Sequence, residues 1–517
     1  MENRQGLDKL VAVLEVGSTG IRLLVAEMKS GGQWNVVDRA GMPVAFGRDV
    51  FNSSALSRES LLECIAVLKK FRELLAGWGI AASDVYVIAT SALRVARNRD
   101  MFIDRVFQET GFHLTVVDGI EENRLMYLGV HYALKQDMPL FWRANSMIIE
   151  IGGGSTEIML LRRGQMVAAH SVRLGTIIID QRIRVKTGTS PWLLHERYLS
   201  ETIRNTSSLL NADMDLSRVR TFVVAGSDAR LASIKAGSEL NKDCRVIARN
   251  DFIAFAEKIK SYTVEECVRK LGISYSEAEG FIPGILVLKL FLEQTGAAQV
   301  VVPLLSIREG YLIDLSLGVD SELQEEFYSQ IFASAVSLGR KFHYDETHSR
   351  HVAGLCMTLF DALVKEHGMN RRHRMMLETA AILHDIGTYI KSSGHNKHGQ
   401  YIVNNSDIFG LHRYELDVIA NVIRYHRGDP PSQSDIKYIS LEREERILVL
   451  KMASILRVAD ALDHSHSQHI KNITVERRAE TVALYAHGVH DISLELMGIE
   501  KKADMFQSVF GYKVILS

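Results

Sequence analysis

The stretch that decides the fold of this 517-residue chain is Glu150-Ile151-Gly152-Gly153-Gly154-Ser155-Thr156-Glu157. It ends an apolar run, residues 146–151, that predicts a β-strand. The three glycines let the backbone approach a phosphate closely, and Ser155 and Thr156 add hydroxyl donors. The carboxylates of Glu150 and Glu157 can hold a magnesium ion whose charge offsets the phosphate. The alternative is a flexible glycine turn between solvated glutamates, although such a turn needs no flanking carboxylates.

The chain opens twice with the same pattern. Each set predicts three successive strands joined by tight turns, and the first turn of each set is rich in Gly, Ser and Thr. The strands are residues 10–16, 21–28 and 34–40 in the first set, and 146–151, 158–161 and 165–171 in the second. This repetition indicates two related α/β domains with mixed sheets that face each other across a cleft.

The first of these turns carries Glu15-Val16-Gly17-Ser18-Thr19-Gly20-Ile21-Arg22. Converging backbone amides, the Ser18 hydroxyl and the forked guanidinium of Arg22 suit phosphoryl oxygens. An ordinary hairpin is the alternative for this segment alone.

Three further segments add polar side chains next to predicted strands or helices. Arg94 closes the segment Ala89-Thr90-Ser91-Ala92-Leu93-Arg94 after a strand at 85–89, and Gly226-Ser227 follow a strand at 221–225. The segment Gly119-Ile120-Glu121-Glu122-Asn123-Arg124-Leu125 opens a predicted helix that runs to about residue 134. Acidic residues in such a first turn often do no more than complement the helix dipole.

Composition narrows the class of protein. The 61 basic and 62 acidic residues leave a formal charge of -1, which gives no global reason to bind nucleic acid or a membrane surface. The four cysteines show no CxxC spacing and are expected to be buried thiols in a reducing compartment. The segment MENRQGLDKL resembles neither a signal peptide nor a membrane span, so we expect a cytoplasmic protein.

The second half of the chain differs from the first, because fifteen of the nineteen histidines lie at or after His343. Apolar residues three and four apart predict an all-helical domain, and alternation from about residue 473 predicts a small α+β segment. The predicted helices are 324–338, 351–364, 374–383, 416–425, 445–462 and 499–510, followed by a strand at 513–516.

This helical domain carries its own set of possible metal ligands. His348, His384-Asp385 and Asp460 resemble the H…HD…D order of the HD superfamily, and Ile382 to Gly387 is the most specific part. Imidazoles and carboxylates from separate helices suit a divalent transition metal such as manganese. His395, His398 and His426 are possible ligands for a second ion. Histidines buried in the core with satisfied hydrogen bonds are the alternative.

Six ordered motifs carry a resemblance over about the first 315 residues. EVGSTGIR, ATSALR, GIEENRL, EIGGGSTE, VVAGSDARLAS and SIREG resemble the exopolyphosphatase and guanosine-pentaphosphate phosphohydrolase (Ppx/GppA) family. The resemblance implies two ribonuclease-H-like domains of the acetate kinase/actin-like (ASKHA) fold, and long members carry an HD-like domain. It also implies magnesium-dependent removal of the terminal phosphate from polyphosphate or guanosine pentaphosphate.

The resemblance assigns roles to residues of this chain. Glu122 matches the general base that activates the attacking water, and Glu150 and Glu157 match the magnesium-binding pair. The phosphate cradle matches Gly152, Gly153, Gly154, Ser155 and Thr156, and the same cleft would be lined by Ser18, Arg22, Arg94, Gly226 and Ser227.

The chain departs from the family pattern at four positions. The family usually has aspartate at Glu15 and Glu150, asparagine at Thr19, and an arginine near Glu277. Because the longer acids displace a carboxylate, we expect a slow hydrolase.

We expect actin-like domains at 1–130 and 131–315, a linker at 316–321, an HD-like domain at 322–470 and a small α+β domain at 471–517. The expected function is removal of a terminal phosphate from polyphosphate or guanosine pentaphosphate, by a homodimer. Two alternatives stay open: a weakly active sensor of a phosphorylated ligand, and metal-dependent chemistry in the HD-like domain. A kinase of the same fold is disfavoured because GIEENRL supplies a water-activating base.

Overall fold

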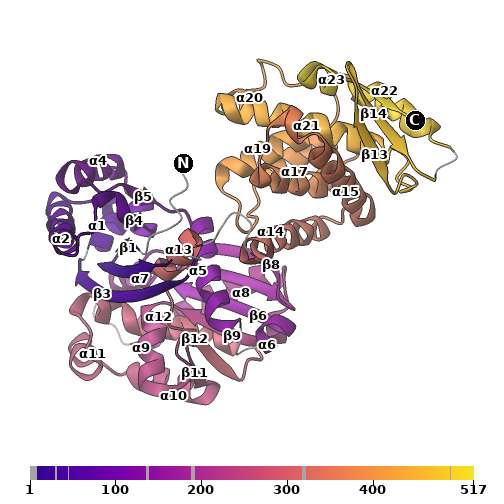
Figure 1. The fold of residues 1–517 in the computed structure, drawn as a ribbon. Helices are drawn as coiled ribbons and strands as arrows, with labels where there is room; N and C mark the ends of the chain where they lie inside the picture. Colours follow the sequence, from indigo (N-terminus) through magenta and orange to yellow (C-terminus); the bar gives the residue numbers. More distant parts are fainter. Residues whose placement is uncertain are drawn as a thin grey trace. The chain divides into compact units, whose positions relative to one another are not determined.

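The structure, a computed structural model, describes residues 9–29, 32–44, 46–135, 139–187, 192–316, 322–488 and 491–517. The chain forms two compact units, Met1–Glu325 and Glu326–Ser517 (Figure 1). The predicted linker lies outside the described residues from 317 to 321, and the finer domain boundaries remain predictions. Among the described residues, no helix is long and apolar enough to cross a bilayer.

The first unit contains two sheets built on the same plan. In each sheet a strand pairs antiparallel with the next strand and parallel with a strand that comes much later in the chain. Sheet A has the order β3-β2-β1-β4-β5, and sheet B, read from its other edge, begins β8-β7-β6-β9-β12. The two sheets therefore repeat one topology, as the duplicated sequence pattern predicts, and we call the parts built on them lobe I and lobe II.

Most strands agree with the predicted ranges within two or three residues. Sheet A contains β1 (Lys9–Gly17), β2 (Gly20–Met28), β3 (Trp34–Pro43), β4 (Val85–Ala89) and β5 (Leu114–Val116). Sheet B contains β6 (Asn145–Ile151), β7 (Thr156–Arg162), β8 (Gln165–Val172), β9 (Val219–Ala225), β10 (Ser238–Asn241), β11 (Cys244–Ala248) and β12 (Gln299–Pro303). Strands β5 and β10 to β12 were not predicted.

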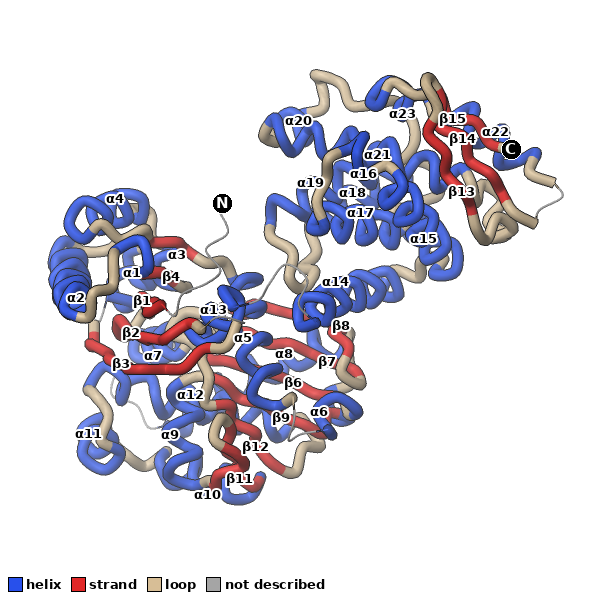
Figure 2. Tube along the Cα trace, viewed as in Figure 1, coloured by secondary structure: helices blue, strands red, loops and turns tan. Residues whose placement is uncertain are grey.

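Helices cover the sheets of the first unit, and each sheet has its own apolar core (Figure 2). The helices of lobe I are α1 (Phe46–Ser53), α2 (Arg58–Gly77), α3 (Ser91–Val95) and α4 (Arg99–Thr110). Those that follow are α5 (Gly119–Leu134), α6 (Pro139–Arg143), α7 (Thr176–Thr187), α8 (Trp192–Asn211), α9 (Ser227–Ala236), α10 (Arg249–Ile259), α11 (Val264–Leu271), α12 (Tyr275–Glu293) and α13 (Ile307–Ser316). All four cysteines are buried and free, as predicted.

Helices α5 and α13 connect the two lobes. They pack against each other, and α13 also contacts β1 and β2 of lobe I whereas α5 contacts β7, β8 and β12 of lobe II. Gly310 makes the close approach possible, because a Cβ there would lie 2.1 Å from the carbonyl oxygen of Leu125. The first turn of α5, which holds Glu122, is thereby fixed between the sheets.

The second unit is mostly helical and ends in a small sheet. Its helices are α14 (Glu322–Lys341), which begins at the unit boundary, α15 (Glu346–Ala362), α16 (Val364–His367), α17 (Arg371–Leu383), α18 (His395–Asn404), α19 (Arg413–Tyr425), α20 (Ile436–Ile439) and α21 (Arg443–Ala461). The last elements are β13 (Ile473–Arg477), β14 (Thr481–Ala486), α22 (Ser493–Lys502), α23 (Asp504–Phe510) and β15 (Lys513–Leu516). Helices α15, α17, α19 and α21 pack on one another.

One predicted helix of this unit is wrong in extent. Residues 499–510 do not form a single helix, because α22 ends at Lys502 and α23 starts at Asp504. The buried Arg457 fixes this break: its Nε donates to the carbonyl oxygen of Lys502 at 2.9 Å, and its Nη2 lies 3.0 Å from the Asp504 carboxylate. These contacts are tertiary, so the apolar spacing of the segment could not reveal them.

Candidate active site

The turns that end β1 and β6 meet at one cleft of the first unit. A Cβ added to Gly153 would lie only 2.7 Å from the Cβ of Ser18, so the two turns touch and leave no room for a side chain. Within the second turn the amide of Gly152 donates to the carbonyl oxygen of Ser155 at 2.8 Å. The repeated hairpin openings therefore bring their Gly, Ser and Thr residues together, as the sequence predicts.

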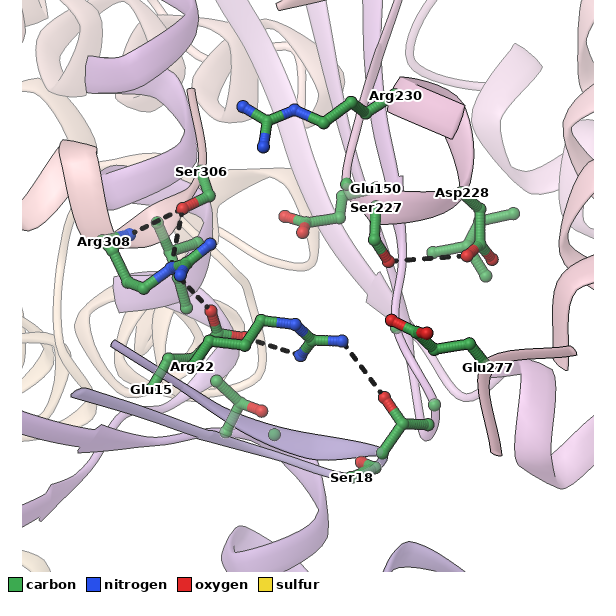
Figure 3. Close-up of a pocket in the computed structure, with 18 of the residues that line it drawn as sticks. Glu15, Ser18, Arg22, Glu150, Ser227, Asp228, Arg230, Glu277, Ser306 and Arg308 are labelled. Carbon is green, nitrogen blue, oxygen red and sulfur yellow. Dashed lines mark hydrogen bonds and ion pairs between the residues drawn. The ribbon is translucent and has the colours of Figure 1, made fainter. Parts of the chain in front are cut away.

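These turns form part of the lining of a cavity of about 540 Å³ (Figure 3). Among the predicted site residues, those that line it are Ser18, Arg22, Glu122, Glu150, Gly152, Gly153, Ser155, Glu157, Gly226 and Ser227. Three predicted residues, Arg94, Gly154 and Thr156, are not part of this lining. Their contacts show what they do instead.

Gly154 and Thr156 contact other parts of the protein and support the second turn. A Cβ on Gly154 would lie 2.3 Å from the Cζ of Phe51, so a larger residue there would require the Phe51 ring to move. The Thr156 hydroxyl is buried and donates to the carbonyl oxygen of Leu174. In this structure both residues hold the backbone of the turn in place, and direct contact of either with a phosphate remains a prediction.

Arg94 pairs with the predicted general base. Its Nη1 lies 2.6 Å from Oε2 of Glu122 and donates to the carbonyl oxygen of Val117 at 3.0 Å. The predicted contact between Arg94 and a phosphate stays a prediction, whereas its contact with Glu122 is part of the structure. Because the same nitrogen also donates to the Val117 carbonyl oxygen, the guanidinium holds the Glu122 carboxylate in a fixed position at the cavity.

Glu122 lies in the first turn of α5, where Asp118 caps the helix by accepting from the amide of Glu121 at 2.7 Å. The residue is only 9% exposed. Burial raises the pKa of Glu122 to about 8, and the charge of Glu157 adds to the increase while Arg94 opposes it. A carboxylate whose pKa lies near neutral pH is suited to accept a proton from water.

Glu150 and Glu157 are cross-strand partners in the β6–β7 hairpin, so both side chains lie on the same face of sheet B. Burial raises the pKa of Glu150 to about 7, with further contributions from the charges of Glu15 and Glu157. Burial also raises the pKa of Glu157, although Ser171 donates to its Oε1 at 2.8 Å. Buried carboxylates that lie close together repel one another, and a bound cation would relieve this repulsion. Carboxylate oxygens are the ligands that magnesium prefers. The residues present therefore fit a magnesium ion.

The sequence patterns did not single out three basic residues that line the cavity, Arg39 of β3, Arg230 of α9 and Arg308 of α13. Arg308 is the second residue of α13, and its Nε lies 3.3 Å from Oε2 of Glu15. The Arg22 guanidinium lies 3.8 Å from Oε1 of the same glutamate (Figure 3). Arg39 and Arg230 also line the cavity. The SIREG motif pointed to Arg308, but nothing in the local sequence indicated which strand end it would face.

The acidic residue Asp228 was also missed. It is the second residue of α9, next to Ser227, and lines the cavity opposite the first turn. Burial raises the pKa of Asp228 to about 7, with Arg22 opposing the change and Glu277 adding to it. Glu277 itself caps α12, because the amide of Ser274 donates to its carboxylate at 3.0 Å.

A second cavity of about 420 Å³ adjoins the first, since Arg39, Arg230, Leu304 and Leu305 line both. Its outer wall has an aromatic pair, Trp34 of β3 and Tyr132 of α5, with ring centroids 5.6 Å apart. Lys242 adds a further positive charge.

In the second unit, the predicted metal ligands His348, His384, Asp385 and Asp460 do come together. Asp460 Oδ1 lies 3.7 Å from His348 Nε2 and 3.9 Å from His384 Nε2, and Asp385 Oδ2 lies 3.9 and 3.7 Å from the same atoms. His395 and His426 lie next to Asp385, but His398 belongs to none of the candidate metal groups formed by the described residues. Asp463, which touches His348, was not predicted.

The sequence matches two family models. Residues 24–318, more than half of the chain, match the Ppx/GppA phosphatase family, and residues 332–495 match Ppx/GppA phosphatase, domain III. A guanosine-5'-triphosphate,3'-diphosphate pyrophosphatase of Pseudoalteromonas atlantica is 24% identical over 461 residues, which cover 87% of each chain. The protein of the same name from Photobacterium profundum is 22% identical over 88% of each chain.

Solved structures share the fold of the first unit. An exopolyphosphatase from Cytophaga hutchinsonii superposes with a TM-score of 0.54 at 19% identity, over 60% of this chain and 100% of that one. An exopolyphosphatase-like protein gives a TM-score of 0.50 at 20% identity, over 59% of this chain and 97% of that one. The family models cover most of both units, and the duplicated lobes with their two touching turns agree with this match. The chain therefore belongs to the Ppx/GppA phosphatase family.

Proposed function

We propose that the protein is a phosphohydrolase that removes the terminal phosphate of guanosine pentaphosphate or polyphosphate at the cavity between lobes I and II. The observation that carries the proposal is the position of Glu122, a buried carboxylate with a raised pKa beside two touching Gly-Ser turns. The relatives named as pyrophosphatases of guanosine-5'-triphosphate,3'-diphosphate support the same reaction class.

The proposed reaction is attack of water on the terminal phosphorus. Glu122 accepts a proton from the water as its oxygen bonds to phosphorus, and the bond from phosphorus to the bridging oxygen breaks. The shortened polyphosphate chain or guanosine tetraphosphate leaves with the bridging oxygen, and inorganic phosphate is released. No covalent intermediate with the protein is needed.

The cavity has groups that suit the oxygens of the terminal phosphate. Ser18 Oγ is buried and has no hydrogen-bond partner among the described residues, so a bound phosphate oxygen would satisfy it. The Gly152 and Gly153 turn provides backbone close to the same place, and Arg22 and Arg308 carry the positive charge. Glu150 and Glu157 would hold a magnesium ion, which supplies neutralisation of phosphate charge when bound.

The adjoining cavity favours the nucleotide over polyphosphate. A purine base can stack on the Trp34–Tyr132 pair, which polyphosphate cannot use, and base–aromatic stacking contributes ~1–3 kcal/mol. Lys242, Arg39 and Arg230 surround the same space and suit a second phosphate group. We therefore place the terminal phosphate of the 5′ chain at the Gly-Ser turns and the guanosine in the adjoining cavity.

The alternative function is a sensor that binds the nucleotide and turns it over slowly. Glu15 favours this alternative. The resemblance leads us to expect the shorter aspartate at this position, and the Glu15 carboxylate lies between Arg22 and Arg308. We further propose a cytoplasmic location, which the four buried free thiols support, and a homodimer.

Phosphate release tests the function directly. Purified protein is mixed with guanosine pentaphosphate or long-chain polyphosphate in magnesium, and the product is quantified. Turnover that is lost in Glu122→Gln supports the hydrolase, and tight nucleotide binding without turnover in the parent protein supports the sensor.

A further inference from the structure

A small cavity of about 20 Å³ adjoins the cleft cavity at the two touching turns, where Ser18, Thr19 and Gly280 line both spaces. The cavity with the aromatic pair adjoins the cleft elsewhere, at Arg39 and Arg230, and shares none of its described lining residues with the small cavity. Ser18 and Arg230 lie on opposite sides of the cleft cavity (Figure 3). The cleft therefore has a wide end beside the aromatic pair and a narrow end beside the turns.

Charged residues from both lobes form the outer wall of the narrow end. Arg48 of α1, a helix in the core of lobe I, pairs with Glu279 of α12, and its Nη2 lies 3.9 Å from Oδ2 of Asp180 of α7. Helices α7 and α12 belong to the core of lobe II. The Gln181 Nε2 also donates to the carbonyl oxygen of Arg48 at 3.2 Å. We call Arg48, Asp180 and Glu279 the clasp, because they hold the two lobes together here.

The packing beneath the clasp leaves almost no free space. The amide of Gly47 donates to the carbonyl oxygen of Ser18 at 3.1 Å, so the start of α1 is fixed to the first turn. A Cβ on Gly47 would lie 2.8 Å from Cδ1 of Ile177, and a Cβ on Gly153 would lie 3.0 Å from the same atom. Ile177 therefore fills the space between the two turns. The remaining cavity can hold about one water molecule, and a phosphate group is too large for it.

We propose that the clasp and Ile177 close the narrow end of the cleft and so restrict hydrolysis to the terminal phosphate of a chain. The inference rests on the proposed function, which places that phosphate at the Gly-Ser turns. An internal phosphate beside Ser18 would require the chain to continue in both directions. Only the wide end, with Arg39 and Arg230, has room for further phosphates. Arg48 and Ile177 thus determine specificity, whereas Glu122 activates the water.

The clasp can be removed without a large loss of stability. The Arg48 side chain is 41% exposed, and ion pairs of exposed side chains contribute little to folding. The double variant Arg48→Ala, Ile177→Ala removes the clasp cation and the side chain that fills the space between the turns. We call it the opened variant, and circular dichroism checks that it is folded.

The first test counts protein molecules on a chain and needs no hydrolysis. Long linear polyphosphate of uniform length is titrated in Mg²⁺, with all proteins in a Glu122→Gln background, and the complexes are sized by analytical ultracentrifugation. If only chain ends enter the cleft, a saturated chain holds one binding site at each end, whatever its length. The opened variant should bind along the chain, so that the number of bound molecules rises several-fold and grows with chain length.

The second test follows the products of hydrolysis, with Glu122 intact, on a gel. The parent should release inorganic phosphate and shorten each chain from its end. In the opened variant, water can also attack an internal phosphorus, and cleavage of the bond to the bridging oxygen divides the chain into two pieces of intermediate length. Arg58→Ala removes an exposed arginine at the start of α2 and is the matched control. Arg48→Lys keeps a cation, and both variants should act on ends alone.

The outcomes separate this proposal from the proposed function. A folded opened variant that still binds and cuts at the ends alone overturns the closure, as does a parent that binds along the chain. An opened variant that binds no chain also overturns it, because Arg48 and Ile177 would then serve only to support the turns. A parent that binds chain ends but releases no phosphate contradicts the hydrolase and supports the closure.

Discussion

Arg94 Nη1 lies 2.6 Å from Oε2 of Glu122, so the proposed general base forms an ion pair inside the protein. Burial and the neighbouring Glu157 raise the pKa of Glu122 to about 8, and Arg94 is the largest influence in the opposite direction. The pKa of Glu122 is therefore set by two opposing influences, desolvation of the carboxylate and the charge of the Arg94 guanidinium.

Arg94→Met is expected to shift the acidic limb of the pH–rate profile upward. Glu122 must be deprotonated to accept a proton, so the rate rises with pH through the pKa of Glu122. Loss of a cation raises that pKa, and the half-maximal rate should move to higher pH by about one unit or more. The measurement is phosphate release from pH 5 to pH 10. Arg97→Met, an exposed arginine near the same loop, is the control, and an unchanged limb in Arg94→Met contradicts the assignment.

Trp34→Ala is expected to separate the two substrates. Loss of one stacking partner, ~1–3 kcal/mol, should reduce kcat/KM for guanosine pentaphosphate by roughly tenfold and leave polyphosphate within about twofold. Trp78→Ala, which removes an exposed tryptophan at the end of α2, is the control. Equal losses on both substrates would show that Trp34 supports the fold and not a base, while the hydrolase itself would stand.

Asp228→Asn is expected to change how stability depends on pH. The pKa of Asp228 is raised to about 7 in the folded state, above its usual ~3.9 in an unfolded chain, so folding takes up a proton between these values. The resulting contribution of Asp228 to the free energy of unfolding is complete below pH ~4 and is lost as pH rises through ~7. The loss amounts to at most about 1.4 kcal/mol per pH unit.

Asparagine stays neutral and cannot lose the contribution. The variant should therefore gain stability relative to the parent between pH 5 and pH 8, measured by urea unfolding at each pH. A constant difference between the two proteins across this range would mean that Asp228 titrates normally.

We expect the parent protein to be a slow hydrolase, because Glu15 and Glu150 are each one methylene longer than the aspartate that the family usually has there. One extra methylene moves a carboxylate by ~1.5 Å, and a misplacement of ~1 Å can reduce the rate on the order of a hundredfold. Glu150→Asp should then increase turnover on at least one substrate. A lower rate in both Glu15→Asp and Glu150→Asp would show that the site has adapted to glutamate, since Arg22 and Arg308 already contact Glu15.

Local patterns predicted the elements that carry the cleft. Alternating apolar residues and Gly-Ser turns located β1, β2, β6 and β7, and Glu122 occupies the predicted first turn of a helix. The same patterns could not show that Arg94 would pair with Glu122, because 28 residues separate them and the contact depends on how α3 and α5 pack.

The cluster of histidines and aspartates in the second unit shows the same limit. The His-Asp dipeptide at 384–385 was a recognisable signal, whereas Asp463 and Lys502 become neighbours of His348 and Asp460 only after α15, α21 and α22 pack together. Bonds from Nδ1 to carbonyl oxygens three residues earlier in the chain depend on the local conformation at each histidine. They cannot be inferred from spacing.

The central claim is that Glu122 activates water in the cleft. Phosphate release from guanosine pentaphosphate in magnesium should be lowered by a factor of 10² to 10⁴ in Glu122→Gln, with nucleotide affinity within a few-fold of the parent, because the amide keeps the shape and cannot accept the proton. Glu121→Gln, one residue earlier and paired with Arg124, is the matched control and should keep most of the activity. A Glu122→Gln protein that releases phosphate at the parental rate would contradict the claim.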